Sequence, residues 1–191
     1  MAAPDGLRFD CGRICLDLMA TDGPPAERLT GPEQLRAWLA GAGVVPGAAP
    51  LDGIDGRWVA RFCALRALLR RVVQDELGGR AATGDLDLLN RTAAAADPPA
   101  VRAVRGPDGA LVRTLPGPPD CAALLAAVAR DALTLLTDTA ARGRLRHCEG
   151  ESCPLVYLDT SRGRRRRWCS SSACGNRARV ARHRRRTDRS R

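Results

Sequence analysis

The stretch CEGESCPLVYLDTSRGRRRRWCSSSACGNR, residues 148–177, decides how the C-terminal part of this chain folds. It holds two cysteine pairs, Cys148 with Cys153 and Cys169 with Cys174, and four residues separate the members of each pair. Four thiolates fill the tetrahedral shell of Zn²⁺ and leave no position for water or substrate. The pattern therefore predicts a structural zinc site. Free buried cysteines or a redox pair are the alternatives. We see no secretory leader and expect a reducing, cytoplasmic location, which favours metal ligands over disulfides.

The residues around the cysteines predict a small folded module. Val156 to Leu158 are typical of a short strand, and after a turn the chain returns through Arg164 to Trp168, which predicts a hairpin. The serines at 170–172 are good N-cap residues for a helix running from Ala173 to about Arg186. Cys174 would lie in its first turn, where the helix dipole favours a thiolate. A knuckle, a hairpin and a helix-borne ligand together predict a treble-clef-like zinc finger.

The same residues carry a family resemblance. The steps Arg167-Trp168-Cys169-Ser170 and Cys174-Gly175-Asn176-Arg177 resemble the CGNR zinc finger, over about residues 143–186. In such proteins the finger follows an ABATE domain, and the stretch from Gly12 to Thr21 is similar to the opening strand of that domain. This chain keeps Leu16, Asp17 and Thr21 and departs from the pattern at Leu18 and Ala20. The resemblance implies a stress-induced transcription regulator.

The predicted organisation has three parts. Residues 1–142 would form an ABATE-like α+β domain, residues 143–186 the CGNR-type finger, and residues 187–191 a disordered basic tail. Within the first part we expect one or two strands between Leu7 and Met19 and no membrane-spanning segment. Helices are expected near 30–41, with Thr30 as N-cap, and near 58–77, 83–97 and 120–141, and a hairpin joins 101–104 to 111–115.

The charge is concentrated at the C-terminus. No lysine occurs, and from Arg142 to Arg191 sixteen arginines face four acids, a net charge of +12, whereas the rest of the chain carries about −2. A GC-rich genome would also favour arginine. A small module with this charge favours a polyanion, so we predict DNA binding, with an acidic protein partner or a merely solvated tail as alternatives. The candidate contacts are Arg164, Arg165, Arg166, Arg167, Arg177, Arg179, Arg182 and Arg184.

RNA is a weaker prediction, because only Tyr157 and Trp168 in the module could stack on bases. Trp168 beside a ligand cysteine is more typical of a packed side chain. His147 could substitute as a metal ligand, but a surface position is expected for it. Asp17 is equally consistent with a ligand site or with a capped turn. The remaining cysteines are expected to be small buried hydrophobic residues: Cys11, Cys15, Cys63 and Cys121.

These patterns predict a DNA-binding regulator whose N-terminal domain senses a small molecule, dimerises or recruits a protein. Catalysis is not expected, because neither histidine lies in the N-terminal domain and no phosphate-binding loop or nucleophile elbow is visible. The alternative is an enzyme or small-molecule-binding protein whose finger is only structural. Carboxylates such as Asp17 and Asp22 would then supply acid–base groups. Oligomeric state and target sequence are not predicted.

Overall fold

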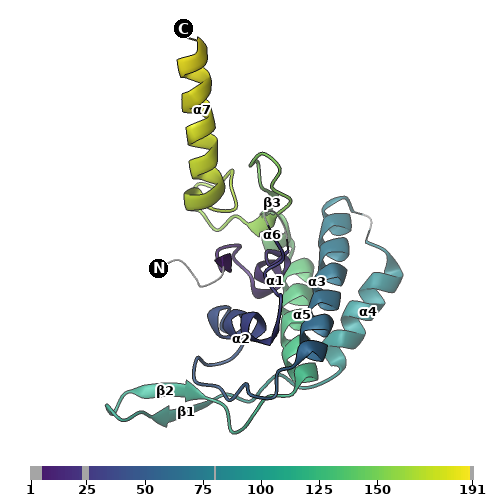
Figure 1. The fold of residues 1–191 in the computed structure, drawn as a ribbon. Helices are drawn as coiled ribbons and strands as arrows, with labels where there is room; N and C mark the ends of the chain where they lie inside the picture. Colours follow the sequence, from purple (N-terminus) through teal and green to yellow (C-terminus); the bar gives the residue numbers. More distant parts are fainter. Residues whose placement is uncertain (1–5, 23–25, 80, 190–191) are drawn as a thin grey trace.

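The computed structural model describes residues 6–22, 26–79 and 81–189. The helices are α1 (Ile14–Met19), α2 (Pro32–Gly41), α3 (Gly56–Leu77), α4 (Thr83–Ala94), α5 (Cys121–Thr137), α6 (Thr139–Arg142) and α7 (Asn176–Arg189). Two antiparallel hairpins pair β1 (Arg102–Arg105) with β2 (Leu111–Thr114), and β3 (Leu145–His147) with β4 (Val156–Leu158). In Figure 1, α7 and the β1–β2 hairpin project from opposite ends of a helical body. The predicted α+β class with a small finger is confirmed.

The long helix α3 organises the body. Asp55 caps it, since its carboxylate accepts hydrogen bonds from the amides of Arg57 at 2.9 Å and Trp58 at 3.1 Å. Its apolar stripe is buried against α1, α4 and α5, and Phe62 on this stripe meets Trp38 of α2 edge-on, with ring centroids 5.9 Å apart. Burial stabilises each such side chain by about 1.5–3 kcal/mol. Leucine, valine and alanine fill most of this core, as the scarcity of aromatic residues requires.

The expected strands between Leu7 and Met19 are wrong. Residues 7–10 have no regular secondary structure, residues 11–13 form a bend, and the chain then enters helix α1. Gly12 makes the bend possible with a φ of +91°, a conformation that other residues rarely adopt. The apolar run 14–19 looks like a strand in the sequence because α1 is buried on nearly all sides and lacks a polar face.

Other boundaries differ in smaller ways. The helix expected over 120–141 is divided at Asp138, whose backbone is extended and whose carboxylate caps α6 through the amides of Ala140 and Ala141. The N-cap of α2 is Gly31 and not Thr30. The hairpin β1–β2 is confirmed, with Val104 opposite Val112. Helix α7 continues to Arg189, so part of the predicted disordered tail is helical, and residues 190–191 lie outside the described residues.

The helical body and the finger share one hydrophobic core. The cluster of buried side chains extends from α3 and α5 into β3, β4 and the finger cysteines. Segment 7–12 joins the two parts, because the Leu158 amide donates to the Cys11 carbonyl at 2.8 Å. A Cβ on Gly12 would lie 3.2 Å from Leu158. In the part of the chain that the structure describes, no helix is both long and apolar enough to cross a membrane.

Candidate metal centre and basic helix

The four predicted cysteines come together at one point. The sulfur atoms of Cys148, Cys153, Cys169 and Cys174 all lie within 4.8 Å of one another. The Cys169 sulfur is 3.7 Å from that of Cys153 and 3.6 Å from that of Cys174. A tetrahedral ion with metal–sulfur bonds of about 2.3 Å requires sulfur–sulfur distances of about 3.8 Å. The residues therefore fit a metal ion bound by four thiolates, with no open position.

The first pair lies on the loop between β3 and β4. Cys148 follows β3 directly, and its amide donates to the Leu155 carbonyl at 2.9 Å, while the Cys153 amide donates to the Gly150 carbonyl at 3.0 Å. Gly150 fits closely here, because a Cβ would lie 3.0 Å from the Cβ of Cys174 and 3.1 Å from its sulfur, tighter than most real Cβ contacts. The loop backbone thus passes directly beside the second cysteine pair.

The predicted hairpin partner of β4 is wrong. Val156 to Leu158 pair with Leu145 to His147 and not with the segment Arg164–Trp168. That segment is instead held by Asp159, whose carboxylate accepts from the Ser161 amide at 2.9 Å and the Arg166 amide at 3.2 Å. Because this carboxylate ties down the basic turn, residues 164–168 return to the cysteines without forming a strand.

The second pair brackets a tight turn. Ser170 caps a π-helical turn, Ser171–Gly175, through a 3.3 Å hydrogen bond from the Ala173 amide, and α7 follows at Asn176. Cys174 therefore precedes α7, whereas the sequence predicted it inside the helix. Burial acts to raise the pKa of the Cys174 thiol, but hydrogen bonds from Arg177 and the neighbouring cysteines outweigh burial, so this pKa is lowered. Burial raises the pKa of Cys153 to about 11. Binding of a cation would displace its proton.

Two guanidinium groups contact the cysteine sulfurs. Arg177 donates to the Cys174 sulfur at 3.1 Å. Arg8 donates to the Cys169 sulfur at 3.2 Å and to the Cys169 carbonyl at 3.1 Å, and Asp10 holds it by a 2.8 Å ion pair. A divalent ion with four thiolates carries about −2, which these two cations offset. The sequence analysis missed Arg8 because only the fold brings residue 8 to a cysteine 161 positions away.

Two of the predicted DNA-contacting arginines form contacts within the protein, Arg166 half-buried and Arg167 exposed. Arg166 stacks on Tyr157, with 4.6 Å from its guanidinium carbon to the ring centre, and donates to the carbonyls of Trp168, Asp10 and Cys169. Arg167 forms a 2.6 Å ion pair with Glu149 and lies 5.2 Å over the Trp168 ring. Arg166 in particular has little freedom to turn toward a partner.

The other predicted arginines lie on the surface. Arg179 donates to the Ser171 carbonyl at 3.3 Å, and Arg177 is the brace of Cys174. Four of the predicted arginines, all among the described residues, have exposed side chains with no hydrogen bond or ion pair to the protein: Arg164, Arg165, Arg182 and Arg184. These four side chains are available to an external partner.

The remaining sequence candidates are structural. Trp168 is half-buried against the core, and His147 is exposed, as predicted. Three of the other four cysteines are buried, while Cys63 is half-buried. Asp17 is buried and accepts a 2.9 Å hydrogen bond from the Cys11 amide, and burial raises its pKa to about 7. This is the capped-turn role that was one of its two interpretations.

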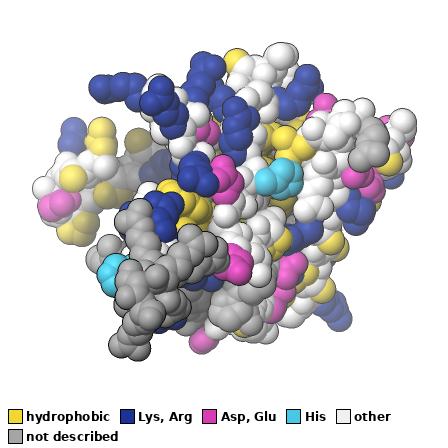
Figure 2. Space-filling model, turned by 90° about the horizontal axis from the view of Figure 1, so that it is seen from above, with side chains coloured by type: hydrophobic (Ala, Val, Ile, Leu, Met, Phe, Trp, Pro, Cys, Tyr) yellow, Lys and Arg dark blue, Asp and Glu magenta, His cyan; other side chains and the backbone are white. Residues whose placement is uncertain are grey.

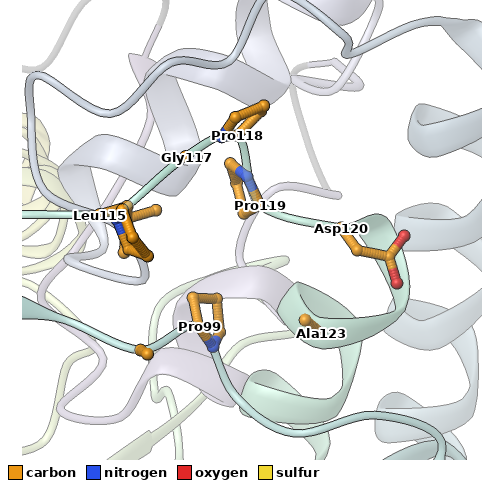
Figure 3. A pocket seen from close by; sticks show the side chains of 9 residues that line it. Pro99, Leu115, Gly117, Pro118, Pro119, Asp120 and Ala123 are labelled. Atoms are coloured by element: carbon orange, nitrogen blue, oxygen red, sulfur yellow. The ribbon is translucent and has the colours of Figure 1, made fainter.

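Two hollows in the described part of the helical body could receive a small molecule. One, of about 620 Å³, lies between α3, α4 and α5, with apolar walls that include Leu65, Leu68 and Leu88 and with arginines such as Arg61 and Arg91 in its lining. The other, of about 400 Å³, lies where the β1–β2 hairpin joins α5. Proline rings line it, and the Asp120 carboxylate points away from them (Figure 3). The first hollow combines apolar walls with positively charged side chains.

Comparison with known families agrees with this geometry. A model for ABATE, "Putative stress-induced transcription regulator", matches residues 12–139, and a model for the CGNR zinc finger matches residues 144–187. No curated protein matches the chain significantly. The four cysteines that lie together and Asn176 and Arg177 all fall within the second matched region. The chain belongs to the ABATE family and carries a C-terminal CGNR zinc finger.

Proposed function

We propose that this protein is a DNA-binding transcription regulator whose finger is held by one structural Zn²⁺. The observation that carries the proposal is helix α7, which projects from the body and is rich in arginine (Figure 1). Beyond its first turn it packs against few other elements, and its described side chains are exposed except for half-buried Ala178 and Ala181. An isolated helix of this length is marginal in water, so a partner that covers it would stabilise it.

The finger also has the charge that a duplex requires. Arginine side chains lie on the face seen from above in Figure 2, the end of the molecule from which α7 projects. Arg164 and Arg165 extend this charge to the basic turn before Cys169. Phosphates attract such a surface through counterion release, and arginine can pair bidentately with phosphate or guanine.

DNA is favoured over single-stranded RNA because the two aromatic rings of the finger are already packed against the protein. Tyr157 is buried under Arg166, and Trp168 is half-buried with Arg167 over its ring. Neither ring offers the free face on which an unpaired base would stack. An acidic protein partner is the competing proposal, since it would be attracted by the same charge.

The other parts of the proposal follow from this role. The helical body would receive a small-molecule or protein effector, with the hollow between α3, α4 and α5 as the candidate site. The protein would act in the cytoplasm at the nucleoid and would not be an enzyme. The finger would stabilise the DNA-binding end and would not catalyse a reaction, because four cysteines leave the ion no open position.

Binding of the zinc-loaded full chain to random duplex DNA across salt concentrations tests the proposal. If about five phosphates are contacted, log K should fall with log salt at a slope of about −4.5. Reversing the charge at Arg164 and Arg165 should flatten the slope, whereas Arg130→Glu, on α5 of the helical body, is the control. Absence of salt-dependent binding by a folded, zinc-loaded protein would refute DNA binding and favour the acidic partner.

A further inference from the structure

Helix α7 has two unlike faces. One faces the loop between β3 and β4 across a cleft of about 590 Å³, which is lined by Glu149, Glu151 and four residues of the helix. Those four are Arg177, Ala178, Ala181 and Arg182. The two alanines are half-buried, which fits a face turned toward the protein. A duplex that met this face would clash with the loop and its two carboxylates.

The opposite face follows from the helical repeat. At about 3.6 residues per turn, the positions turned away from the cleft are Asn176, Arg179, Val180 and His183. All four are exposed, and 44% of the Val180 side chain is accessible to solvent. Val180 is unusual on this helix, because an exposed valine brings neither charge nor favourable helix propensity. An exposed valine on the outward stripe would gain from an apolar contact with a partner, which the neighbouring arginines do not provide.

The chemistry of the stripe matches base edges. An amide such as Asn176 can pair with both adenine positions in the major groove, arginine pairs bidentately with guanine, and an apolar side chain contacts the thymine methyl group. Arg182, at the edge of the cleft face, and Arg184 lie on the two sides of this stripe, where phosphates would be met. A helix with its side chains is about 10–12 Å across, which fits a major groove about 12 Å wide.

We propose that Asn176, Arg179 and Val180 read base edges in the DNA major groove, while Arg182 and Arg184 bind the flanking phosphates. This inference rests on the proposed DNA-binding function. One N–H of Arg179 donates to the Ser171 carbonyl at 3.3 Å, which directs the side chain toward the start of the helix and leaves its other N–H groups available to a base. The reading residues are therefore concentrated in the first turns of α7, where recognition helices make most of their base contacts.

Selection from a random duplex library, followed by sequencing, tests the stripe with the zinc-loaded full chain. The wild type should enrich one motif. Asn176→Ala should relax preference at one position by roughly 5- to 150-fold, and Val180→Ala should relax preference at a second position by a smaller factor. Their salt slope and zinc content should stay unchanged. Arg182→Ala is the matched control, and it should weaken binding to every sequence and reduce the salt slope by about 0.9.

The possible outcomes distinguish failure of base reading by α7 from failure of the proposed DNA-binding function. If the wild type binds duplex DNA but enriches no motif, or if both stripe variants keep the wild-type motif, the reading stripe is refuted and DNA binding stands. If the wild type does not bind DNA at all, both are refuted. Asn176→Ala with lost zinc would assign that residue to the fold of the finger, and Val180→Ala then decides the proposal.

Discussion

Replacing Arg8 by glutamine should weaken zinc binding although Arg8 lies outside the finger. Its guanidinium donates to the Cys169 sulfur at 3.2 Å and to the carbonyl of the same residue at 3.1 Å. The side chain is only 16% exposed, so water screens the interaction little. Glutamine keeps a polar amide but removes the charge and shortens the reach. Among the described residues, Arg8 is the only cation that donates a hydrogen bond to the Cys169 sulfur. Its replacement would leave the Cys169 thiolate without a cationic donor.

The size of the effect follows from this geometry. A hydrogen bond to a charged group contributes about 1.5–3 kcal/mol, and loss of a partner in the outer shell of a metal site costs about 10- to 100-fold in affinity. We therefore expect the zinc dissociation constant of Arg8→Gln to rise about tenfold or more. The increase in the dissociation constant should be smaller if the Asp10 carboxylate, no longer paired with Arg8, moves away from the negatively charged thiolates.

Competition with a chromophoric zinc chelator measures this constant directly. Arg130→Gln is a matched control, because Arg130 also bonds two backbone carbonyls, those of Ala93 and Ala96, but lies in the helical body. It should leave zinc affinity unchanged. An Arg8→Gln protein that is folded and binds zinc within twofold of the wild type would refute the view that segment 7–12 completes the metal site.

Three further predictions concern the finger and the buried carboxylate. Gly150→Ala should lower zinc affinity and the melting temperature, because the new methyl group would press on Cys174. Gly163→Ala is the control and should change neither, because its Cβ would lie 3.9 Å from the nearest side chain. Equal melting curves for the two variants would contradict this prediction. Cys153→Ala should lose stoichiometric zinc by elemental analysis while Cys63→Ala retains it, and retained zinc in the first variant would exclude Cys153 as a ligand. The pKa of Asp17 is about 7 in the folded chain against about 3.9 unfolded, so its contribution to stability should fall as pH rises from about 4 to 7. Asp17→Asn should remove this loss of stability, which amounts to up to about 4 kcal/mol. Denaturant titrations at pH 5 and pH 8 measure the free energy of unfolding of both proteins. If it changes between the two pH values by the same amount in the variant and in the wild type, the prediction is refuted.

The metal centre was predictable because its chemistry is local. Cysteine is the residue type that four-coordinate zinc requires, and the pairing of Cys148 with Cys153 and of Cys169 with Cys174 is visible in the sequence. The long helices were predictable for a similar reason, since the apolar stripe of α3 repeats with the helical period.

What escaped prediction depends on long-range packing. Helix α1 was mistaken for strand because burial on nearly all sides removed the polar face that marks a helix. The partner of β4 was misassigned because Leu145 to His147 offer no stronger strand signal than the basic segment after the turn. Charge alone could not separate Arg166, which holds the finger together, from Arg165, which is free to meet a partner. That distinction requires knowledge of which carbonyls and rings lie within reach.

The contacts of segment 7–12 connect the metal centre to the helical body. Arg8 contacts Cys169, the Cys11 carbonyl accepts from β4, and the Cys11 amide donates to Asp17 on α1, which packs against α3 and α5. A metal ion held by the four cysteines would therefore be expected to stabilise a unit larger than the finger, since these bonds link the cysteines to α1. By the same linkage, an effector that moves α1 would change the free energy of the finger, and the finger would change the affinity for that effector by the same factor. The two family regions are consecutive in the sequence, and the contacts of segment 7–12 link the finger to the helical body.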